Sequence, residues 1–523
     1  NSANRLFNDI HITNFFAGTE INSTDRSKNY YQGWGMQYSM GEIPYYVYEF
    51  FKKGIEDGNN YYSLSQTRSR SAAFFANATY SYKGRYTVNG TARYEGTNRM
   101  GKSRSARWLP TWNVSGAWNA HEEKFFSNLT SVLSHFTLKA SYSLTADRGP
   151  ADVTNSQAII TSYSPYRPFT SIQESGLYIK ELENSELTYE KKHELNIGAD
   201  MGFLNNRINL AVDWYKRNNY DLIGIVNTQG AGGQILKYAN IASMKSHGIE
   251  FTLSTKNIKT KDFNWNTDFI FSNAKNEVTD LKQNANVMEL ISGNGFAKQG
   301  YPVRGLFSIP FVGLDKDGIP VIINEKGEAT STDINFQERQ NTGFLKYEGP
   351  TDPTITGSLG NMFSYKGFRL NLFITYSFGN VIRLNPVFKA YYSDLTAMTR
   401  EFKNRWTLPG DEAKTNVPAI LSKRMYDSNE DLKYAYNAYN YSTERIAKGD
   451  FIRLKEISLA YDFPKAWINP LKLTDLSLKV QATNLFLIYA DDKLNGQDPE
   501  FFNAGGVASP VPRQFTITLR LGL

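Results

Sequence analysis

The segment Leu195–Trp214 reads LNIGADMGF, LNNR and INLAVDW, and its pattern recurs in much of the chain. On either side of the polar tetrapeptide at residues 204–207, apolar residues alternate with polar or very small ones. Strict alternation predicts two β-strands, each with one apolar and one polar face. Each run has about nine residues, roughly the length that a tilted strand needs to cross a bilayer. If the apolar face covers a protein core, the hairpin belongs to a soluble sandwich. If it faces lipid, the chain is a membrane barrel.

The same alternation recurs on a regular schedule. Strands are predicted at residues 11–19, 74–82, 86–94, 112–118, 136–144, 195–203, 208–214, 249–253, 263–271, 355–363, 368–378, 451–463, 476–482 and 515–523. The alternation slips near Glu456, which predicts a β-bulge. Tight turns alternate with long insertions, among them residues 20–73, 146–192 and 380–449, the last with a helix predicted near 395–405. This sorting of connection lengths is typical of outer-membrane barrels, whereas a soluble sandwich has no reason to show it.

Composition agrees with a barrel and excludes other classes. Mean hydropathy is −0.47, and no run approaches the roughly 18 apolar residues of a membrane helix. Aromatic residues make up 14% of the chain, which suits girdles at membrane interfaces. The chain has no Cys, so disulfides and thiol chemistry are excluded. The net charge of +7 is scattered along the chain, and we interpret it as surface charge near lipid headgroups rather than a nucleic-acid site.

We therefore predict an all-β fold: a transmembrane antiparallel β-barrel with long extracellular loops and short periplasmic turns. About 14 strands are visible, an even number that is able to close alone. Large single-chain barrels with a plugged lumen have about 22 strands. Residues 1–523 are thus expected to be either a self-contained pore or the C-terminal part of a larger barrel.

Seven short motifs resemble those of the SusC/RagA-type TonB-dependent outer-membrane transporters, and they occur in the family's order. They are Asn184–Glu190 before the hairpin of Leu195–Trp214, Ser246–Glu250, Phe363–Phe368, Asn404–Thr407 with Asn416–Pro418, Phe451–Tyr461, Asn484–Phe486 and Pro512–Phe515. Each motif alone is weak, but seven in order are specific. The resemblance implies that residues 1–523 are the C-terminal part of a barrel whose plug domain and N-terminal strands are not present in this chain.

The resemblance further implies an importer of oligosaccharides or oligopeptides in the bacterial outer membrane. Its implied partners are a SusD-like lipoprotein, the TonB complex, the N-terminal half of the same barrel and outer-membrane lipid. No cofactor and no nucleic-acid partner are expected. The alternative is a non-transporting scaffold barrel in a larger outer-membrane assembly. An enzyme or a surface adhesin has no identifiable group of residues behind it.

Aromatic loop residues are the predicted contacts for substrate or partner. The first cluster is Tyr30, Tyr31, Trp34, Tyr45 and Tyr46, and the second is Tyr426, Tyr434, Tyr436 and Tyr439. Tyrosines among polar neighbours stack on sugars, contact peptides or anchor partner proteins. The alternative is that these rings pack against one another or at the membrane interface.

Catalytic and metal sites are not expected. The five histidines are scattered, whereas a metal site needs several converging ligands. Asp491, Asp492 and Asp498 crowd one segment and are a weak candidate for calcium, although a solvated acidic loop is the more frequent meaning of such a run. The sequence Asp315–Gly318 lacks the later acidic positions of an EF-hand, so we predict an Asp-Gly turn there.

Overall fold

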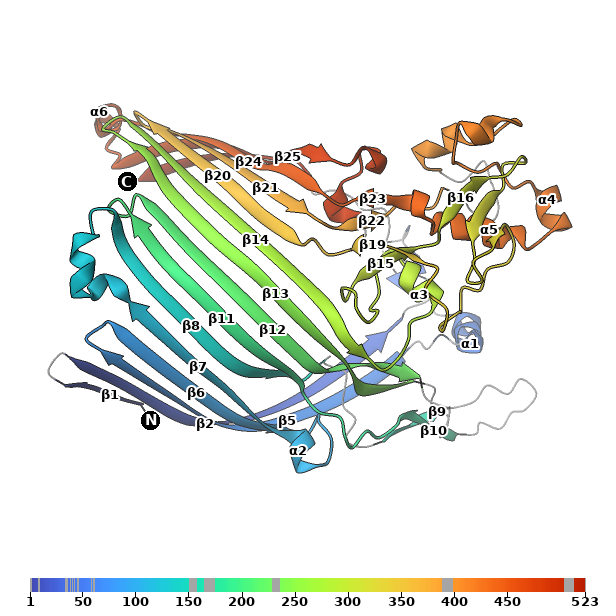
Figure 1. The fold of residues 1–523 in the computed structure, drawn as a ribbon, viewed down its shortest axis with the longest axis horizontal. Helices are drawn as coiled ribbons and strands as arrows, with labels where there is room; N and C mark the ends of the chain where they lie inside the picture. The colour runs from blue at the N-terminus through green and yellow to red at the C-terminus, as the bar shows by residue number, and fades with distance from the viewer. Residues whose placement is uncertain are drawn as a thin grey trace. The chain divides into compact units, whose positions relative to one another are not determined.

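The computed structural model describes residues 2–7, 10–32, 36–37, 39, 41, 43–44, 47–57, 59, 62–149, 158–163, 175–227, 236–387, 398–502 and 512–522. Within these residues the main feature is a 15-stranded sheet in which strands that follow one another in the chain are neighbours (Figure 1). Its strands are β1 (Ser2–Phe7), β2 (His11–Tyr31), β5 (Tyr62–Tyr82), β6 (Tyr86–Thr97), β7 (Trp108–Asn119), β8 (Leu133–Asp147), β11 (Glu190–Phe203), β12 (Ile208–Asn227), β13 (Leu236–Lys259), β14 (Phe263–Leu281), β20 (Ile355–Tyr365), β21 (Phe368–Phe378), β24 (Phe451–Asp462), β25 (Asp475–Ala490) and β26 (Gln514–Gly522). The prediction of an all-β fold is confirmed.

The chain divides into two compact units. The first comprises Asn1–Gly116, Ser141–Glu194 and Asn219–Ala242, and the second comprises Ala117–Ala140, Leu195–Asn218 and Ser243–Leu523. None of the helices in the described part of either unit has the length and apolar character of a membrane span.

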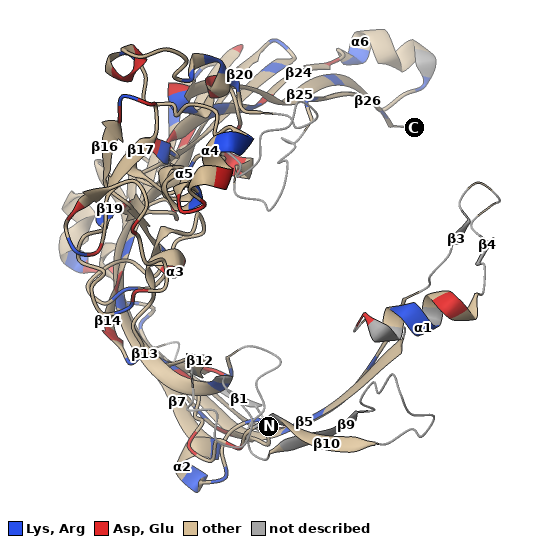
Figure 2. Cartoon of the chain, turned by 90° about the vertical axis from the view of Figure 1, so that its right-hand side faces the viewer, with Lys and Arg blue, Asp and Glu red and all other residues tan. Residues whose placement is uncertain are grey.

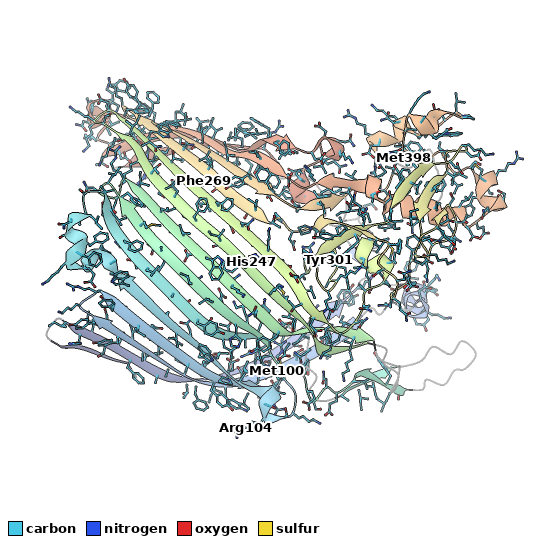
Figure 3. All side chains as sticks on the ribbon, in the orientation of Figure 1. Met100, Arg104, His247, Phe269, Tyr301 and Met398 are labelled. Carbon is cyan, nitrogen blue, oxygen red and sulfur yellow. The ribbon has the colours of Figure 1, made fainter. Side chains whose placement is uncertain are left out.

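In the second unit the alternation of residues produces one apolar and one polar face across six strands. The register aligns one apolar row over β14, β20, β21, β24, β25 and β26, namely Trp265, Phe363, Leu370, Leu459, Val480 and Ile517. The adjacent row points to the other face and is mostly polar, namely Asn264, Ser364, Arg369, Ala460, Lys479 and Thr518. Phe269, on the same face as Trp265, belongs to a second apolar row with Leu359 and Ile374, beyond the row of Thr267 (Figure 3). A single-residue shift in any strand would exchange its two faces, so the apolar pattern fixes this register.

The slip in the pattern near Glu456 is a β-bulge, as predicted. Phe373 pairs with Glu456 while Ile374 pairs with Leu454, so Lys455 is left over. One extra residue on β24 restores Leu454 to the apolar face that Ile457 and Leu459 also occupy. The bulge therefore keeps the face apolar on both sides of the irregularity.

The first unit contains a long hairpin whose length the sequence pattern underestimated. β2 and β5 pair without interruption from His11 opposite Tyr82 to Tyr31 opposite Tyr62. The expected insertion of residues 20–73 is thus wrong at both ends, because its flanks are strand. This extension has no apolar face, as the exposed ion pair of Asp25 with Arg68 at 2.6 Å shows. Alternation is absent where neither face of a strand is buried.

Four neighbouring strands of the first unit each contribute one ring to an aromatic row. His193 of β11 lies between Tyr142 of β8 and Tyr220 of β12, with both ring centroids at 5.7 Å. Trp112 of β7 meets Tyr142 edge-on at 5.5 Å. Rows of aromatic side chains on the outer face are typical of the interface levels of membrane barrels. The hairpin connection also holds β3 (Met36–Gln37), β4 (Ile43–Pro44) and α1 (Tyr48–Glu56), and other connections hold α2 (Arg104–Arg107), β9 (Ile159–Tyr163) and β10 (Gly176–Glu181).

In the second unit, connections of different length gather at opposite ends of the strands. The β13–β14 and β20–β21 turns lie at one end together with the β24–β25 connection, which contains α6 (Lys465–Ile468), and the long connections lie at the other end (Figure 1). The connection after β14 contains α3 (Val287–Ile291), β15 (Gly305–Ser308), β16 (Phe311–Leu314), β17 (Pro320–Ile323), β18 (Ala329–Thr330) and β19 (Lys346–Pro350). The connection after β21 contains β22 (Val381–Arg383), the 3-10 helices η5 (Arg400–Asn404), η6 (Asp411–Ala413) and η7 (Thr443–Arg445), α4 (Lys423–Ser428), α5 (Leu432–Asn440) and β23 (Ile446–Lys448).

The described parts of these two connections fold into one body, here called the loop module (residues 282–354, 379–387 and 398–450). Ala438 of α5 joins a buried cluster formed by the other connection, whose members include Val287, Leu290, Ile291, Phe307 and Ile309. Tyr301, labelled in Figure 3, packs edge-on against Phe307, with the ring centroids 5.0 Å apart. The expected helix near 395–405 is only the short η5, and residues 388–397 lie outside the described residues. Burial of this apolar surface is what orders connections of such length.

Candidate functional site

A buried arginine joins the two halves of the loop module. Arg383 of β22 is 6% exposed. Its guanidinium donates to the carbonyl oxygens of Ser442 at 2.8 Å, Phe307 at 2.6 Å and Ile291 at 3.4 Å. Burial lowers the pKa of Arg383 to about 9, so the group is still protonated at pH 7. Arginine suits this position because its planar fork donates several hydrogen bonds in fixed directions.

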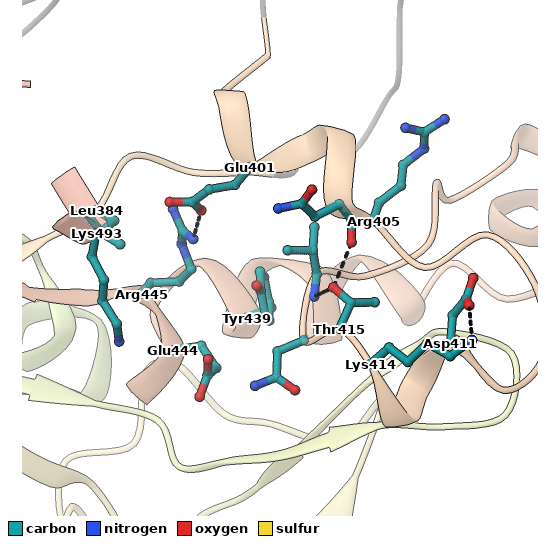
Figure 4. A pocket seen from close by; sticks show the side chains of 13 residues that line it. Leu384, Glu401, Arg405, Asp411, Lys414, Thr415, Tyr439, Glu444, Arg445 and Lys493 are labelled. Atoms are coloured by element: carbon teal, nitrogen blue, oxygen red, sulfur yellow. Dashed lines mark hydrogen bonds and ion pairs between the residues drawn. The ribbon is translucent and has the colours of Figure 1, made fainter. Parts of the chain in front are cut away.

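The module contains a pocket of about 570 Å³, here called the Arg445 pocket. Its lining comes from the connection after β21, with one residue from the connection after β25 (Figure 4). The lining residues are Leu384, Glu401, Asn404, Arg405, Asp411, Lys414, Thr415, Asn416, Val417, Tyr439, Glu444, Arg445 and Lys493. The volume is within the usual range for ligand sites, about 300–1,000 Å³.

The wall of the pocket is held by an ion pair between a buried arginine and a glutamate that is 22% exposed. Arg445 is 4% exposed and pairs with Glu401, and its other terminal nitrogen donates to the carbonyl of Asn385 at 2.8 Å. Glu401 also accepts from the side-chain amide of Asn495 at 2.8 Å. These contacts join η5, η7 and the connection after β25. Because both members of the pair also bind neighbouring segments, the pair positions the surrounding wall.

The rim of the pocket is a tight turn stabilised by carboxylates. Asp411 accepts hydrogen bonds from the backbone N–H of Leu408 at 3.0 Å and from the hydroxyl of Thr407 at 3.0 Å, which lower the pKa of its carboxyl group. Glu412 accepts from the indole N–H of Trp406 at 2.9 Å, which lowers its pKa in the same way. Both carboxylates are thus ionised at neutral pH and bind their own turn.

Glycine is required where another turn meets this rim. Gly318 has φ +73°, and an added Cβ would lie 2.5 Å from the Trp406 ring and 2.8 Å from Ala419. It ends the segment Asp315–Gly318, in which Asp315 accepts from the N–H groups of Asp317 and Ile319, both at 2.9 Å. The prediction of an Asp-Gly turn is therefore confirmed.

Several polar side chains that line the pocket are available to a ligand. In the described part of the chain, the side chains of Asn404, Asn416 and Glu444 have neither hydrogen-bond nor ion-pair partners. The ammonium group of Lys493 has only a weak contact, 3.5 Å from the carbonyl oxygen of Ile446. The pocket therefore offers two amides, a carboxylate and an ammonium group to a ligand. The motif Asn404–Thr407 with Asn416–Pro418 already marked this segment in the sequence, although its role as a pocket wall was not predicted.

The second predicted aromatic cluster divides into buried and exposed rings. Tyr436 and Tyr439 of α5 are each 1% exposed. Tyr436 donates to the carbonyl of Ala419 at 3.0 Å, and Tyr439 meets Phe311 edge-on at 5.5 Å. Burial raises the pKa of both hydroxyls, that of Tyr439 to about 12. Tyr426 packs against the cluster around Tyr436, and Tyr434 is 37% exposed. The two buried rings support the pocket, and Tyr434 is the one of these four rings with a large exposed face.

The first cluster lies far along the hairpin of the first unit. Tyr30 and Tyr31 end β2 and are 51% and 59% exposed. Trp34, Tyr45 and Tyr46 lie outside the described residues. The structure thus places two of these five rings on an exposed strand end. Their role in binding stays a prediction.

The acidic segment near the end of the chain holds backbone and arginine, and it does not form a ligand set. Asp491 accepts from the N–H groups of Lys448 at 2.8 Å and Lys493 at 2.9 Å. Asp498 pairs with Arg453 at 2.5 Å, and both side chains are buried. Across the described ranges, no group of three or more His, Asp or Glu side chains is placed to bind a metal. In the described part of the chain, Asp491, Asp492 and Asp498 are thus not gathered into a possible metal site, and the structure shows what two of these carboxylates bind instead.

A smaller pocket of about 350 Å³ lies in the first unit. Its charged residues are linked in a network of ion pairs. Arg93 pairs with Glu20 at 2.9 Å and with Glu95 at 2.6 Å, and Glu95 also pairs with Arg148. Tyr189 closes one side and donates to the carbonyl of Arg107 at 3.2 Å. Because these charges satisfy one another, this pocket offers a ligand fewer free groups than the Arg445 pocket does.

Comparison with known proteins identifies what the chain is similar to. The family model described as "TonB dependent receptor-like, beta-barrel" matches residues 2–485. TonB-dependent receptor P39 of Formosa agariphila is 26% identical over 581 residues, which cover 99% of this chain and 52% of that protein. TonB-dependent receptor SusC of Bacteroides thetaiotaomicron is 26% identical over 515 residues, which cover 91% of this chain and 47% of that protein. The chain spans about half the length of the curated relatives it matches.

Among solved structures, the chain is similar to one titled as the RagAB peptide transporter. The TM-score is 0.75 at 21% identity, over 99% of this chain and 54% of the other. The same importer in its "open-open" state gives a TM-score of 0.75 and the same identity. At this identity the likeness establishes a shared fold.

Proposed function

The chain belongs to the TonB-dependent receptor-like β-barrel family, and we propose that it forms part of an outer-membrane importer for oligosaccharides or oligopeptides. The observation that supports this most directly is the continuous apolar face of the second unit, from Trp265 to Ile517 over six strands. A sheet whose polar face lies opposite such a surface suits a wall between lipid and a polar lumen.

The proposal assigns a place in the barrel to residues 1–523. They are the C-terminal part, and the remaining strands and the plug belong to the rest of the same barrel. Relatives about twice as long support this assignment. The loop module then lies outside the cell, where a SusD-like lipoprotein covers it, and the TonB complex acts from the periplasm on the part that carries the plug. The role is transport, in keeping with relatives named as receptors and a fold shared with a transporter.

The test begins with the protein in its native membrane. We would purify it from outer membranes in mild detergent and determine the mass of every polypeptide in the denatured complex. We expect either a chain much heavier than 59.4 kDa or a companion that carries a plug and a TonB box, together with a lipoprotein. A lone chain of this mass would overturn the proposal of energised import.

A second measurement separates a transporter from a scaffold. Cells that express the complex would be given a tryptic digest of casein or a mixture of maltooligosaccharides, with and without a functional TonB. Uptake of either probe that stops when TonB is absent supports import. A complete complex with a plug, but with no TonB-dependent uptake of any probe, would instead favour the scaffold barrel.

A further inference from the structure

We propose that the Arg445 pocket is a binding site for peptide, which it contacts through the peptide backbone and charged groups. This inference rests on the proposed function, because it chooses between the two substrate classes named there. It also assigns the contact to a particular part of the loop module. Four features of the pocket support it: its amides, its charges, its aromatic content and its rigidity.

The two free amides match the groups of a peptide backbone. The side chains of Asn404 and Asn416 each present one carbonyl oxygen and one amide NH2 group, and both side chains are exposed. Such an amide donates to a peptide carbonyl and accepts from a peptide N–H at the same time. Neither side chain has another partner among the described residues. They are therefore available without breaking an internal contact.

Charges of both signs line the same cavity. Glu444 and Lys493 are drawn at one end of the pocket and Lys414 at the other, with Tyr439 between them (Figure 4). Peptides carry an ammonium group and a carboxylate in one molecule, whereas a neutral oligosaccharide carries neither. Single-sign pockets select anions or cations, so a mixed lining favours a zwitterionic ligand.

The aromatic content of the pocket argues against sugar. Tyr439 is the one aromatic side chain among the thirteen described lining residues, and it is 1% exposed. Pyranose rings present an apolar face that binding sites commonly cover with an exposed aromatic ring. No such ring is available within the described lining. A sugar bound here would keep only its hydroxyl contacts.

The pocket is also rigid enough to select its ligand. The Arg445–Glu401 pair fixes one wall, and the hydroxyl of Thr415 donates to the carbonyl of Asn404 at 2.7 Å. Trp406 donates its backbone N–H to the carbonyl of Val417 at 2.9 Å, which fixes the segment that carries Asn416. The backbone that carries the asparagines is thus held before binding, so only their side chains lose conformational freedom when a ligand arrives.

The experiment uses the whole complex purified from outer membranes. It would be incubated with a tryptic digest of casein or with mixed maltooligosaccharides, and the retained molecules would be identified by mass spectrometry. The affinity of one retained peptide would then be measured for the native complex and for variants. The variants are the double substitution Asn404→Ala with Asn416→Ala, and the single substitutions Glu444→Gln and Lys493→Met. Lys423→Met, an exposed lysine of α4 outside the pocket, is the matched control.

We expect peptides to be retained and maltooligosaccharides not. The double substitution should weaken peptide binding about tenfold, since each asparagine loses a hydrogen bond that adds modestly to affinity. The Lys423→Met complex should bind as the native one does. Retention of sugar alone would overturn the inference, as would peptide binding that is unchanged in every pocket variant. Unchanged proteolytic resistance of residues 398–450 would show that the variants are folded.

The outcomes also separate this inference from the function on which it rests. TonB-dependent uptake of maltooligosaccharides with no peptide bound would leave the importer in place and remove the peptide site. Loss of all TonB-dependent uptake, with peptide still bound at the pocket, would remove the importer and leave the site.

Discussion

Arg383 donates a hydrogen bond of 2.6 Å to the carbonyl oxygen of Phe307, 76 residues away in the sequence. The two residues lie in different connections, one after β21 and the other after β14. Because Arg383 also binds the carbonyls of Ser442 and Ile291, one side chain fastens three backbone segments inside the loop module. Substitution of this arginine should therefore destabilise the loop module and leave the strands of the 15-stranded sheet intact.

Arg383→Met is expected to destabilise the loop module by about 3 kcal/mol or more. It removes a charged donor from three backbone carbonyl oxygens, of which that of Ser442 keeps a second donor, the N–H of Arg445. Each hydrogen bond to a charged group contributes about 1.5–3 kcal/mol. Hydrogen exchange of peptides covering residues 287–308 and 441–446 should become fast, while peptides from β20 and β21 stay protected.

Arg339→Met is the control. That arginine binds a single carbonyl, at Asn284, and forms a partly exposed ion pair with Glu289 at 3.6 Å, so its loss should cost about 1 kcal/mol. Equal exchange in the two variants would contradict the role of Arg383.

Asp498→Ala should loosen the connection after β25. Arg453 and Asp498 are 6% and 9% exposed, so loss of the carboxylate leaves a buried cation whose other acidic neighbour is Glu500, at 3.3 Å. Breaking a buried pair from one side costs about 3–5 kcal/mol, and we expect the lower end because Glu500 remains. Hydrogen exchange of the backbone amides of residues 491–502 would measure this loss of stability.

The double variant Arg453→Met with Asp498→Leu is the informative partner of that substitution. With both charges removed, no buried ion is left unpaired, so stability should return to within about 1 kcal/mol of the native protein. A double variant as unstable as Asp498→Ala alone would mean that packing, and not the unpaired charge, causes the loss.

The rim of the Arg445 pocket should weaken in acid. Hydrogen bonds from Leu408 and Thr407 hold the pKa of Asp411 below its ordinary value, and the bond from Trp406 does the same for Glu412. When the folded pKa lies below the unfolded one, the stabilisation is complete above the unfolded pKa. It is lost as the pH falls through the folded pKa. The rim is thus intact at pH 7 and loosens below about pH 4, where carboxyl groups take up protons.

The fluorescence of Trp406 gives a readout for this transition, taken as the difference between the native protein and Trp406→Phe. We expect the difference signal to change in acid and to become insensitive to pH in Asp411→Asn with Glu412→Gln. The same acid change in that double variant would show that other groups control the rim.

Alternation predicted the strands because one physical constraint acts along their whole length. Positions such as Leu370 and Leu459 must be apolar to share one face, and even the bulge at Lys455 is visible as a break in that rule. The hairpin of β2 and β5 escaped detection where Asp25 faces Arg68, because no face is buried there. Strand pairing without burial leaves no periodic signal.

The site was less predictable because its contacts are distant in sequence. The sequence of an aromatic cluster does not distinguish buried rings, such as Tyr436, from exposed ones, such as Tyr434. The partner of Arg383 is a backbone oxygen, and any residue supplies one, so residue type alone carries no signal of it. The segment around Asn404 was marked by family resemblance, yet its pairing with Arg445 through Glu401 required the folded module.

The two faces of the sheet are best tested by neighbouring residues of β21. Leu372 pairs with Asn361 and Ile457 near the middle of the strand, on the face of Leu370, while Asn371 lies on the opposite face with its amide 3.4 Å from Glu456. Leu372→Arg should cost about 2–4 kcal/mol in lipid, and Asn371→Arg much less, because it enters a polar lumen beside a carboxylate. Leu210 offers a weaker test, because it is the third residue of β12 and the penalty near an interface falls to about 0–1 kcal/mol. Unfolding of each variant in vesicles by denaturant would give both energies. Equal costs at Leu372 and Asn371 would mean that the apolar face does not contact lipid.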